Sequence, residues 1–340
     1  MKLKKLLSGI AFNAGGPVRN ADISSLTSNS GEVKKGSLFV AIDGANLDGH
    51  MFVRDALKRG AVAAVVDRRK KLSPGITNLV KVSDTRKALS VAAKNFYGSP
   101  SSAMKVVGIT GTNGKTTISL LIESVFNASG VRSGLIGTIE YRTGKSVVPA
   151  VHTTPGAIEL NALLKDMRKN GIKAAVMEVS SHALDQKRAD DILFDAAIFT
   201  NLTREHLDYH KDLKRYFMAK ARIFNNLKKG GFAVINADDR YAPRLKKMIK
   251  HKCLTYGLGK KAWVTCENVQ TTLDGSSFVV KMRDGGTIPV NTNLVGEHNI
   301  SNVLAAAACC YGLGMGAREI KRGIENLKSV PGRLEPVVSR

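Results

Sequence analysis

Short apolar runs alternate along the chain with segments in which apolar residues recur every three or four positions. The run 106–110 is too short for a helix and is bounded by glycines, which predicts a buried strand. Apolar residues then fall at positions 118, 121, 122, 125 and 126, which predicts an amphipathic helix ending near Gly130. Further buried strands are expected at 134–139, 173–179, 195–200 and 231–236. This alternation favours an α/β fold with a doubly wound, mostly parallel sheet.

The first hundred residues show the same alternation and are expected to form a separate small α/β domain. Strands are predicted at 38–42 and 61–66, and helices at 51–59 and 84–97. The opening segment resembles a signal peptide only briefly, and a first amphipathic helix is favoured there. The Gly-Ser-Pro sequence at 98–100 marks the expected boundary.

The rest of the chain is expected to form a central domain over 101–335. Thr154 is predicted to cap a helix that has Pro155 at its first position. Between 262 and 289, short alternating segments with Asp-Gly turn signals predict a small antiparallel element. Helices are expected at 299–311 and 317–327.

Composition narrows the class of protein. Hydrophobic residues make up 43% and charged residues 24%, which is ordinary for a globular chain, and no stretch is apolar enough to cross a bilayer. The four cysteines show no metal-site spacing, which favours reduced thiols in the cytoplasm. The net charge of +24 raises the possibility of a nucleic-acid partner. Because the basic residues are scattered without interleaved aromatics, a surface that attracts polyanionic small substrates is favoured, with no nucleic acid and no membrane insertion.

A glycine-rich loop between the strand at 106–110 and the following helix carries the strongest chemical signal. Strand, glycine loop, Lys-Thr and helix form the arrangement that holds nucleotide phosphates. Lys115 can reach the outer phosphates, and the Thr116 hydroxyl can ligate Mg²⁺. Ile109 stands where the general pattern has its first glycine. The loop residues are Gly111, Thr112, Asn113, Gly114, Lys115, Thr116 and Thr117.

Other polar residues are expected at the same edge of the sheet, because ligands bind beyond the carboxyl ends of parallel strands. Glu178 ends a predicted strand, where its carboxylate could hold the magnesium ion of a nucleotide or act as a buried structural group. Residues 201–206 follow the strand ending at Thr200. His206 and Lys220 would be undistinguished by themselves.

Several longer motifs then stand in one order: Gly-Thr-Asn-Gly-Lys-Thr-Thr (111–117), His-Thr-Thr-Pro (152–155), Met-Glu-Val-Ser-Ser-His (177–182), Thr-Asn-Leu-Thr-Arg-Glu-His-Leu-Asp-Tyr-His (200–210), Ala-Lys (219–220), Asn-Ala-Asp-Asp (236–239), Gly-Glu-His-Asn-Ile-Ser-Asn (296–302) and Pro-Gly-Arg-Leu-Glu (331–335). In this order they resemble the Mur ligases, and the segments at 152–155 and 180–186 resemble the members that add the third residue of the peptidoglycan stem peptide. The resemblance spans nearly the whole chain.

The resemblance implies a role for each matching position. The loop residues would hold ATP, with Lys115 on its phosphates, Asn299 and Asn302 near adenine and Arg333 near the phosphates. Thr116 and Glu178 would ligate one Mg²⁺, and Glu178, His206 and a carbamylated Lys220 would ligate a second. Residues implied to hold the UDP end of the substrate are Ser28, Ser30, Ala45, Asn46 and Leu47. Residues implied to hold the muramoyl-dipeptide are His152, Thr153, Thr154, Ser180, Gln186 and Arg188.

The implied reaction is an ATP-dependent amide ligation in cell-wall synthesis. ATP would phosphorylate the D-glutamate carboxylate of UDP-MurNAc-L-Ala-D-Glu, and the amine of meso-diaminopimelate, or of L-lysine, would attack the acyl phosphate. Lys115, Glu178, His206 and Lys220 would be the catalytic groups. A monomer is expected.

Two departures from the family pattern qualify this expectation. Asn29-Ser30-Gly31 stands where the family usually has Asp-Ser-Arg. Residues 336–340 would only begin the third domain of the family, so substrate binding with weak or absent ligation is expected. A non-catalytic substrate-binding protein and a folylpolyglutamate synthase-like ligase are the alternatives.

Overall fold

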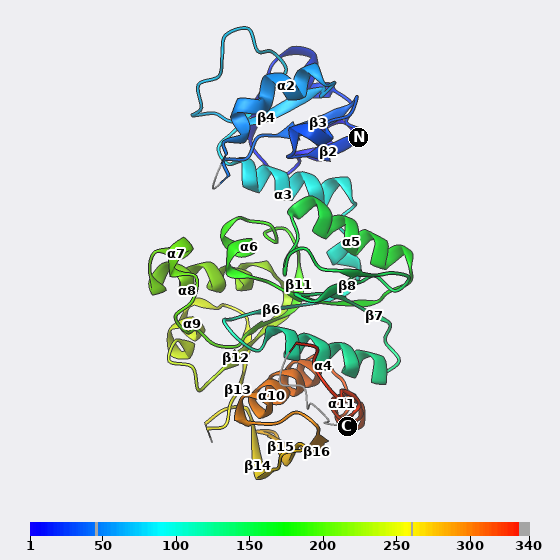
Figure 1. Ribbon diagram of the computed structural model, residues 1–340, viewed down its shortest axis with the longest axis vertical. Coiled ribbons are helices and arrows are strands. Elements are labelled where there is room, and N and C mark those ends of the chain that lie inside the picture. The colour runs from blue at the N-terminus through cyan, green and yellow to red at the C-terminus, as the bar shows by residue number, and fades with distance from the viewer. Residues whose placement is uncertain (45–46, 260, 333–340) are drawn as a thin grey trace, which may run out of the picture. The chain divides into compact units, whose positions relative to one another are not determined.

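The computed structural model describes residues 1–44, 47–259 and 261–332 (Figure 1). The chain forms two compact units. Unit 1 combines Met1–Pro100 with two later segments, Gly156–Lys165 and Gln186–Asp191. Unit 2 contains the remaining described residues. No pattern in the sequence indicated that the two later segments group with unit 1.

Unit 1 is built on one five-stranded sheet. Strands β2, β3, β4 and β5 run parallel, and β1 pairs antiparallel with β5. Side chains of a strand alternate between the two faces of its sheet, so Val65 of β4 packs in one core and Val66 in a second core on the other face. The strand order is β1 (Phe12–Ala14), β5 (Leu79–Val82), β4 (Ala63–Asp67), β3 (Ser37–Val40) and β2 (Ser25–Thr27).

The helices of unit 1 match the sequence pattern only in part. Helix α3 (Thr85–Phe96) lies where a helix was expected, and the Asp84 side chain caps it by accepting from the Lys87 N–H. The helix expected at 51–59 is a 3₁₀ turn, η3 (Gly49–Phe52), that continues into α2 (Val53–Lys58). The opening helix, α1 (Leu3–Leu6), is only a single turn.

Unit 2 is built on an eleven-stranded sheet, most of whose central strands run parallel. Two antiparallel extensions flank this centre, one of them close to the predicted position. The α/β fold class is therefore confirmed. The strand order is β16 (Thr287–Thr292), β15 (Ser276–Met282), β14 (Val264–Thr271), β13 (Lys252–Tyr256), β12 (Leu227–Asn236), β11 (Phe194–Phe199), β6 (Lys105–Thr110), β10 (Ala174–Glu178), β7 (Ser133–Ile136), β8 (Glu140–Arg142) and β9 (Val147–Pro149).

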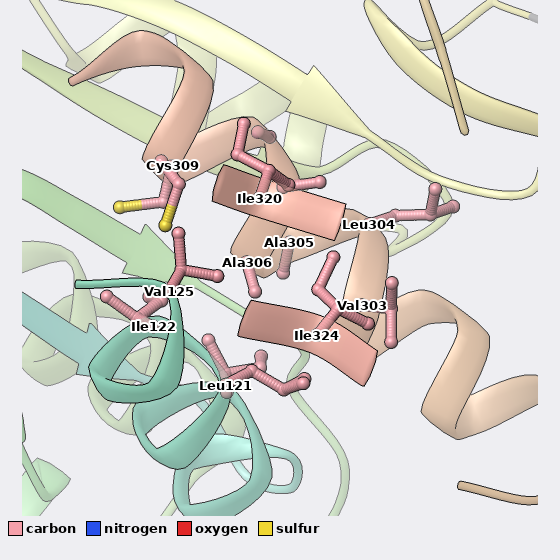
Figure 2. Close-up of a cluster of buried hydrophobic side chains, with 14 of the residues drawn as sticks. Leu121, Ile122, Val125, Val303, Leu304, Ala305, Ala306, Cys309, Ile320 and Ile324 are labelled. Carbon is pink, nitrogen blue, oxygen red and sulfur yellow. The ribbon is translucent and has the colours of Figure 1, made fainter. Parts of the chain in front are cut away.

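Three helices, α4 (Lys115–Ala128), α10 (Glu297–Gly312) and α11 (Ala317–Asn326), share one hydrophobic core in unit 2 (Figure 2). Small side chains of α10, Ala305 among them, allow this close packing. A Cβ at Gly323 of α11 would collide with the backbone of Val125 in α4, so this contact requires glycine. Cys309 and Cys310 of α10 are free thiols buried in the same core.

The remaining helices of unit 2 are short. They are α6 (Ser181–Asp185), α7 (Leu207–His210), α8 (Leu213–Ala221) and α9 (Ala242–Met248). Helix α5 (Ala157–Lys169) begins later than predicted, so the expected capping role of Thr154 is wrong. The Thr154 hydroxyl instead donates to the Glu178 carbonyl at 2.9 Å, which ties the 152–155 segment to the end of β10. Among the described residues, no helix has both the length and the apolarity to cross a membrane.

Candidate functional site

The glycine loop follows β6 and has the backbone that its glycines permit. Gly111 has φ +147°, and a Cβ there would collide with the Thr200 hydroxyl at the end of β11. Gly114, at φ +87°, occupies the N-cap of α4 without a side-chain cap. The first N–H groups of a 14-residue helix are therefore left for another acceptor, which is the arrangement that binds an anion.

A cavity of about 590 Å³ opens beside this loop. The cavity is lined by loop residues 112–117, by Thr138 after β7 and Thr153 after β9, by Glu178 of β10 and by the start of α10. Lys115 lines the cavity, and its Nζ donates to the Thr112 carbonyl at 2.7 Å and to the Gly111 carbonyl at 3.0 Å. The other lining residues are Asn293, Leu294, Val295, His298, Asn299, Asn302, Lys328, Ser329 and Val330.

The Glu178 carboxylate is buried at the end of β10 and is surrounded by hydroxyl groups. Thr116 Oγ1 donates to Oε2 at 3.1 Å, and Thr138 Oγ1 donates to the same oxygen at 3.0 Å. The Thr138 backbone N–H donates to Oε1 at 3.0 Å, and the Thr138 hydroxyl lies 3.1 Å from that of Thr153. An oxygen-only set of one carboxylate and nearby hydroxyls suits Mg²⁺, so these residues fit the first predicted metal site.

Lys220 of α8 is buried, 1% exposed. Its Nζ donates to the Gly111 carbonyl at 2.7 Å, so it shares this acceptor with Lys115. The same nitrogen lies 4.4 Å from the centroid of the Tyr216 ring. Burial and, secondarily, the charge of Lys115 hold the pKa of Lys220 well below its usual range.

His206 belongs to a group of rings beside Tyr216. It precedes α7, is exposed and has a left-handed backbone at φ +54°. Its ring meets that of His182 edge-on at 4.8 Å between centroids and that of Tyr216 edge-on at 6.2 Å. Burial lowers the pKa of the neighbouring His210, and the charge of His182 lowers it further.

The second predicted metal site does not fit Mg²⁺ as the chain stands. Lys220 presents an amine, which cannot ligate a cation, and no group of three or more His, Cys, Asp or Glu side chains among the described residues could hold a metal ion. The structure does bring Thr116, Glu178, Lys115 and Lys220 to one loop. His206 contacts this group only through the ring of Tyr216.

The predicted adenine residues meet at the beginning of α10. Asn302 Nδ2 donates to Asn299 Oδ1 at 3.1 Å, and Asn299 Nδ2 donates to the Val295 carbonyl at 2.9 Å. Asn302 also lies against the loop, since a Cβ at Gly114 would collide with its amide oxygen. Arg333 lies outside the described residues.

The residues predicted to hold the dipeptide fall into two groups. In unit 2, the Ser180 N–H donates to Thr154 Oγ1 at 3.0 Å, and the backbone carbonyl of His152 accepts from the Tyr141 hydroxyl. In unit 1, Arg188 donates to Gln186 Oε1 at 2.7 Å.

The residues predicted to hold the UDP end lie in unit 1, where Ala45 and Asn46 are outside the described residues. Ser28 precedes a 3₁₀ turn, η2 (Ser30–Glu32), which contains Ser30. Asn29 caps this turn by accepting from the Gly31 N–H at 3.0 Å, which accounts locally for the Asn-Ser-Gly sequence. Leu47 is 64% exposed.

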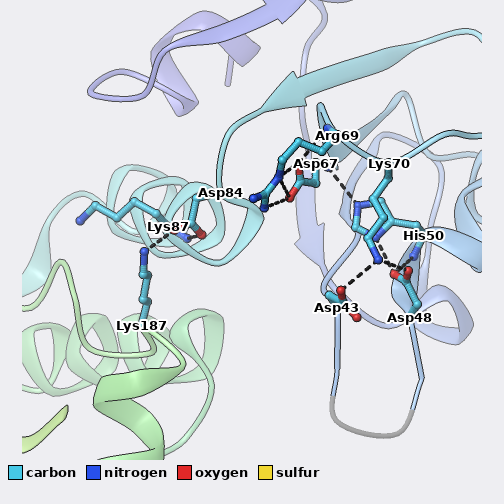
Figure 3. Close-up of polar contacts among 9 residues, drawn as sticks. All are labelled: Asp43, Asp48, His50, Asp67, Arg69, Lys70, Asp84, Lys87 and Lys187. Carbon is cyan, nitrogen blue, oxygen red and sulfur yellow. Dashed lines mark hydrogen bonds and ion pairs between the residues drawn. The ribbon is translucent and has the colours of Figure 1, made fainter. Parts of the chain in front are cut away.

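A polar network fixes the base of the loop that contains Leu47 (Figure 3). The buried His50 ring lies 2.6 Å from Asp48 Oδ1, and its Nε2 accepts from the Asp67 N–H at 3.0 Å. Lys70 Nζ bridges Asp48 at 2.6 Å and Asp43 at 3.0 Å. Burial opposes ionisation of Asp48, but the bonds from Lys70 and His50 outweigh it and lower its pKa to about 2.

Sequence patterns missed two residues of the site. Thr138 contributes both its hydroxyl and its N–H to Glu178, although it stands in an unremarkable position after β7. Tyr216 lies four residues before Lys220, on the same face of α8, and this spacing was the one available signal.

Two family models match the chain. The Mur ligase middle domain matches residues 109–310, and the Mur ligase family catalytic domain matches residues 22–97. These matches cover most of both units.

Curated relatives are similar over almost the full chain. The UDP-N-acetylmuramoyl-L-alanyl-D-glutamate–2,6-diaminopimelate ligase of Geobacter sulfurreducens is 45% identical over 93% of this chain and 63% of its own length. The protein of the same name from Geobacter metallireducens is 43% identical, covering 99% of this chain and 67% of the relative. The chain therefore spans about two thirds of the length of these relatives.

Solved structures give a consistent result. A structure of a UDP-N-acetylmuramoyl-L-alanyl-D-glutamate–2,6-diaminopimelate ligase matches 100% of this chain and 69% of its own, with a TM-score of 0.85 and 28% identity. The folylpolyglutamate synthase of Mycobacterium tuberculosis complexed with ADP matches 73% of this chain and 63% of its own at a TM-score of 0.60, and its 17% identity shows a shared fold alone. With the loop, the carboxylate and the two family matches in place, the resemblance predicted from the motifs is confirmed, and the chain belongs to the Mur ligase family.

Proposed function

We propose that the chain carries out ATP-dependent amide ligation in peptidoglycan precursor synthesis. The substrate would be UDP-MurNAc-L-Ala-D-Glu, and the added residue meso-diaminopimelate, as in the names of the relatives, with L-lysine the alternative. The observation that supports this most is the convergence of the Lys115 loop and the Thr116–Glu178 pair on one cavity. Because these substrates are water-soluble precursors, we expect the reaction in the cytoplasm.

The chemistry follows from the poor reactivity of a carboxylate toward amines. A carboxylate oxygen of the substrate attacks the γ-phosphorus of ATP, and ADP leaves with the electrons of the broken P–O bond. The amine then attacks the acyl carbon, inorganic phosphate leaves, and the nitrogen loses a proton. Lys115 and the N–H groups at the beginning of α4 would offset the negative charge that otherwise keeps phosphate and carboxylate apart.

Two cation sites belong to the proposal. Bound Mg²⁺ would supply positive charge shared by the phosphates and the substrate carboxylate. Thr116 and Glu178 would hold one ion, and Glu178, His206 and Lys220 the other. Lys220 would serve as a ligand only after reaction with CO₂, which requires an uncharged amine, and its burial favours that form.

The remaining residue assignments are also proposals. Asn299, Asn302 and Arg333 would contact the nucleotide. The UDP end would be held by Ser28, Ser30, Ala45, Asn46 and Leu47, and the dipeptide by His152, Thr153, Thr154, Ser180, Gln186 and Arg188.

A nucleotide-binding experiment with matched turnover tests this function. Calorimetry with a non-hydrolysable ATP analogue should show Mg²⁺-dependent binding that Lys115→Met weakens about tenfold or more, because one charge-assisted contact to phosphate is lost. Mass spectrometry should then detect the tripeptide product when UDP-MurNAc-L-Ala-D-Glu, ATP and diaminopimelate are supplied. Nucleotide binding that does not depend on Mg²⁺ or Lys115 would contradict the proposal.

A second candidate is substrate capture without ligation. Binding of both UDP-MurNAc-L-Ala-D-Glu and the ATP analogue, with no tripeptide product and no ADP release, would support this candidate. Measurable ADP release that requires the diamino acid would rule it out.

A further inference from the structure

A run of basic side chains lies on the surface of unit 2, along helix α9 and the residues that flank it. Between positions 240 and 252 the chain contains no acidic residue. Every lysine and arginine of this run is exposed, and none has a carboxylate partner among the residues that the structure describes. These residues, which form the basic segment, are Arg240, Arg244, Lys246, Lys247, Lys250 and Lys252.

The two acidic residues that precede the basic segment direct their oxygens to backbone N–H groups. Asp238 accepts from the Leu258 N–H at 2.6 Å and from the Gly259 N–H at 3.2 Å. Asp239 accepts from the Leu202 N–H at 2.9 Å. The charge of the basic segment is therefore not paired within the described part of the chain.

Helix stability accounts for only part of this charge. Basic residues in the last turn of a helix interact favourably with its dipole, and Lys246 and Lys247 stand there in α9. Lys250 and Lys252 follow the end of the helix and gain little from its dipole. Their exposed ammonium groups are free to meet an anionic partner.

The two arginines are fixed by aromatic rings between α8 and α9, which are neighbours in Figure 1. The guanidinium carbon of Arg244 lies 5.0 Å from the centroid of the Phe217 ring, and that of Arg240 lies 5.0 Å from the Tyr241 centroid. The two rings stack on each other at 5.1 Å. Such contacts orient a guanidinium without cancelling its charge. They also occupy the rings, which are the groups that a single-stranded nucleic acid would need for base stacking.

An exposed apolar side chain stands among the lysines. Met248 is 42% exposed at the end of α9, between Lys247 and Lys250 in the sequence. An apolar side chain gains free energy when it enters the boundary between lipid headgroups and acyl chains, whereas the phosphate backbone of a nucleic acid offers no apolar counterpart. Basic residues with an apolar side chain among them are typical of segments that bind the surface of an anionic bilayer.

We propose that the basic segment is a docking surface for a bilayer that contains anionic phospholipids. The lipid phosphates accept hydrogen bonds from the lysines and arginines, and the Met248 side chain enters between the headgroups. The association is peripheral, since no helix has to cross the bilayer. It does not depend on the proposed ligation.

The position of the segment leaves the nucleotide cavity accessible. Lys250 and Lys252 lie at the amino end of β13, where the register pairs Lys252 with Phe232 of β12. The glycine loop and Glu178 lie at the carboxyl ends of β6 and β10, and all of these strands run parallel. These lysines and the cavity are therefore at opposite edges of the sheet, so a chain bound through the lysines can still bind nucleotide.

Vesicle flotation with the full chain tests this surface. Vesicles of equal parts phosphatidylcholine and phosphatidylglycerol should bind the protein at about 0.15 M salt, where free charges are screened beyond about 8 Å, and pure phosphatidylcholine should not. Replacing Lys246, Lys247 and Lys250 together with glutamine should lower the partition coefficient about tenfold or more, because each basic residue near an anionic surface strengthens binding several-fold. Calorimetry with an ATP analogue should show unchanged nucleotide binding in this variant, which keeps the result separate from the proposed function.

The matched control removes the same charge from unit 1. Lys34, Lys35 and Lys58 are exposed, and replacing all three with glutamine should leave vesicle binding close to that of wild type. Equal losses in the two triple variants would show that binding follows net charge alone and would overturn the proposal. Absence of binding to the mixed vesicles would overturn it as well.

A second comparison separates a bilayer from a nucleic acid. Met248→Ser keeps every charge and should weaken vesicle binding several-fold, because the apolar contact is lost. Unchanged vesicle binding in Met248→Ser would overturn the choice of a bilayer as partner. Tighter binding to duplex DNA than to the mixed vesicles, lost in the lysine variant of the basic segment, would identify a nucleic acid instead and overturn the proposal.

Discussion

At the scale of single residues, the site depends on a few buried polar groups with defined partners. Glu178 accepts three hydrogen bonds, from the Thr116 hydroxyl, the Thr138 hydroxyl and the Thr138 N–H. This carboxylate is therefore held in place before any cation binds. Lys115 and Lys220 share the Gly111 carbonyl, which places two amines at one oxygen. Burial lowers the pKa of Lys220, and the nearby charge of Lys115 lowers it further.

Glu178→Gln should uncouple nucleotide binding from Mg²⁺. The substitution keeps the size of the side chain but removes the charge that a divalent cation requires, so Mg²⁺-dependent affinity for an ATP analogue should fall about tenfold or more. Calorimetry at several Mg²⁺ concentrations measures the change. Glu123→Gln is the control, because that buried carboxylate pairs with Arg142 at 2.6 Å. An unchanged Mg²⁺ dependence in Glu178→Gln would exclude Glu178 as a ligand.

Asp48 should make the stability of unit 1 depend on pH. Its pKa falls from 3.8 to about 2 on folding, so its contribution is complete above about pH 4 and is lost as the pH falls through 2. Asp48→Asn keeps a capping side chain but should cost about 1 kcal/mol at pH 6 after allowance for solvent screening. Urea unfolding of both proteins between pH 6 and 2 measures the difference, which should shrink toward acid. A difference that stays constant across this range would contradict the assignment.

At the scale of elements, α4, α10 and α11 pack closely together (Figure 2). This packing places the glycine loop and the asparagines of α10 on one cavity. Gly323 of α11 lies against the Val125 backbone of α4, and its carbonyl accepts from the Ser124 hydroxyl at 2.6 Å. The helix at 299–311 and the loop at 111–117 are far apart in sequence, so this packing creates the site.

Gly323→Ala should destabilise unit 2 although alanine is the better helix former. The gain in helix propensity is about 1 kcal/mol, whereas forcing a methyl group against the Val125 backbone costs about 1–3 kcal/mol or more. The net expectation is a lower melting temperature with weaker nucleotide binding. Arg322→Ala, at the exposed neighbouring position, should leave both unchanged. A Gly323→Ala protein as stable as wild type would show that the helices can separate without cost.

Sequence patterns predicted elements well where one physical factor dominated. The strand at β10 and the helix α4 follow from apolar runs and from 3.6-residue periodicity, and both lie close to the predicted positions. Strand β13 was not predicted, because Lys252 and Thr255 interrupt its apolar character. Thr154 was misassigned because a threonine before proline suits a helix cap in isolation, whereas its tertiary partner is the Glu178 carbonyl.

The same distinction applies to the candidate site. Lys115, Thr116 and the loop glycines carry their chemistry in a local spacing that can be recognised without a structure. Thr138 acquires its place in the site only through Glu178, which belongs to another element. Tyr216 acquires its place through Lys220 and through Thr112, which contacts its hydroxyl. No local pattern contains such information.

At the scale of the whole molecule, the two units have separate hydrophobic cores. Unit 1 holds the residues proposed for the UDP end, and unit 2 holds the cavity proposed for ATP. The single tryptophan of the chain, Trp263, packs against the core of unit 2.

Leu38→Ala should therefore weaken unit 1 selectively. Leu38 is completely buried in β3, and its truncation should cost about 2–5 kcal/mol. In urea, far-UV circular dichroism should show an earlier transition, while the midpoint of Trp263 fluorescence should stay at the wild-type value. Leu304→Ala, in the core of unit 2, should move the fluorescence midpoint instead. A fluorescence midpoint that shifts with Leu38→Ala would show that the units unfold as one.

The alkylation rate of Cys309 and Cys310 should depend on whether the cavity proposed for the nucleotide is occupied. They lie two to three turns along α10 from Asn299 and Asn302, and burial raises the pKa of both thiols, so alkylating reagents can reach them only when this helix opens. A ligand that binds at the beginning of α10 should slow their alkylation in proportion to the fraction of protein that has the ligand bound. The rate of labelling would then report nucleotide occupancy without a dye, an added reporter group or catalytic turnover.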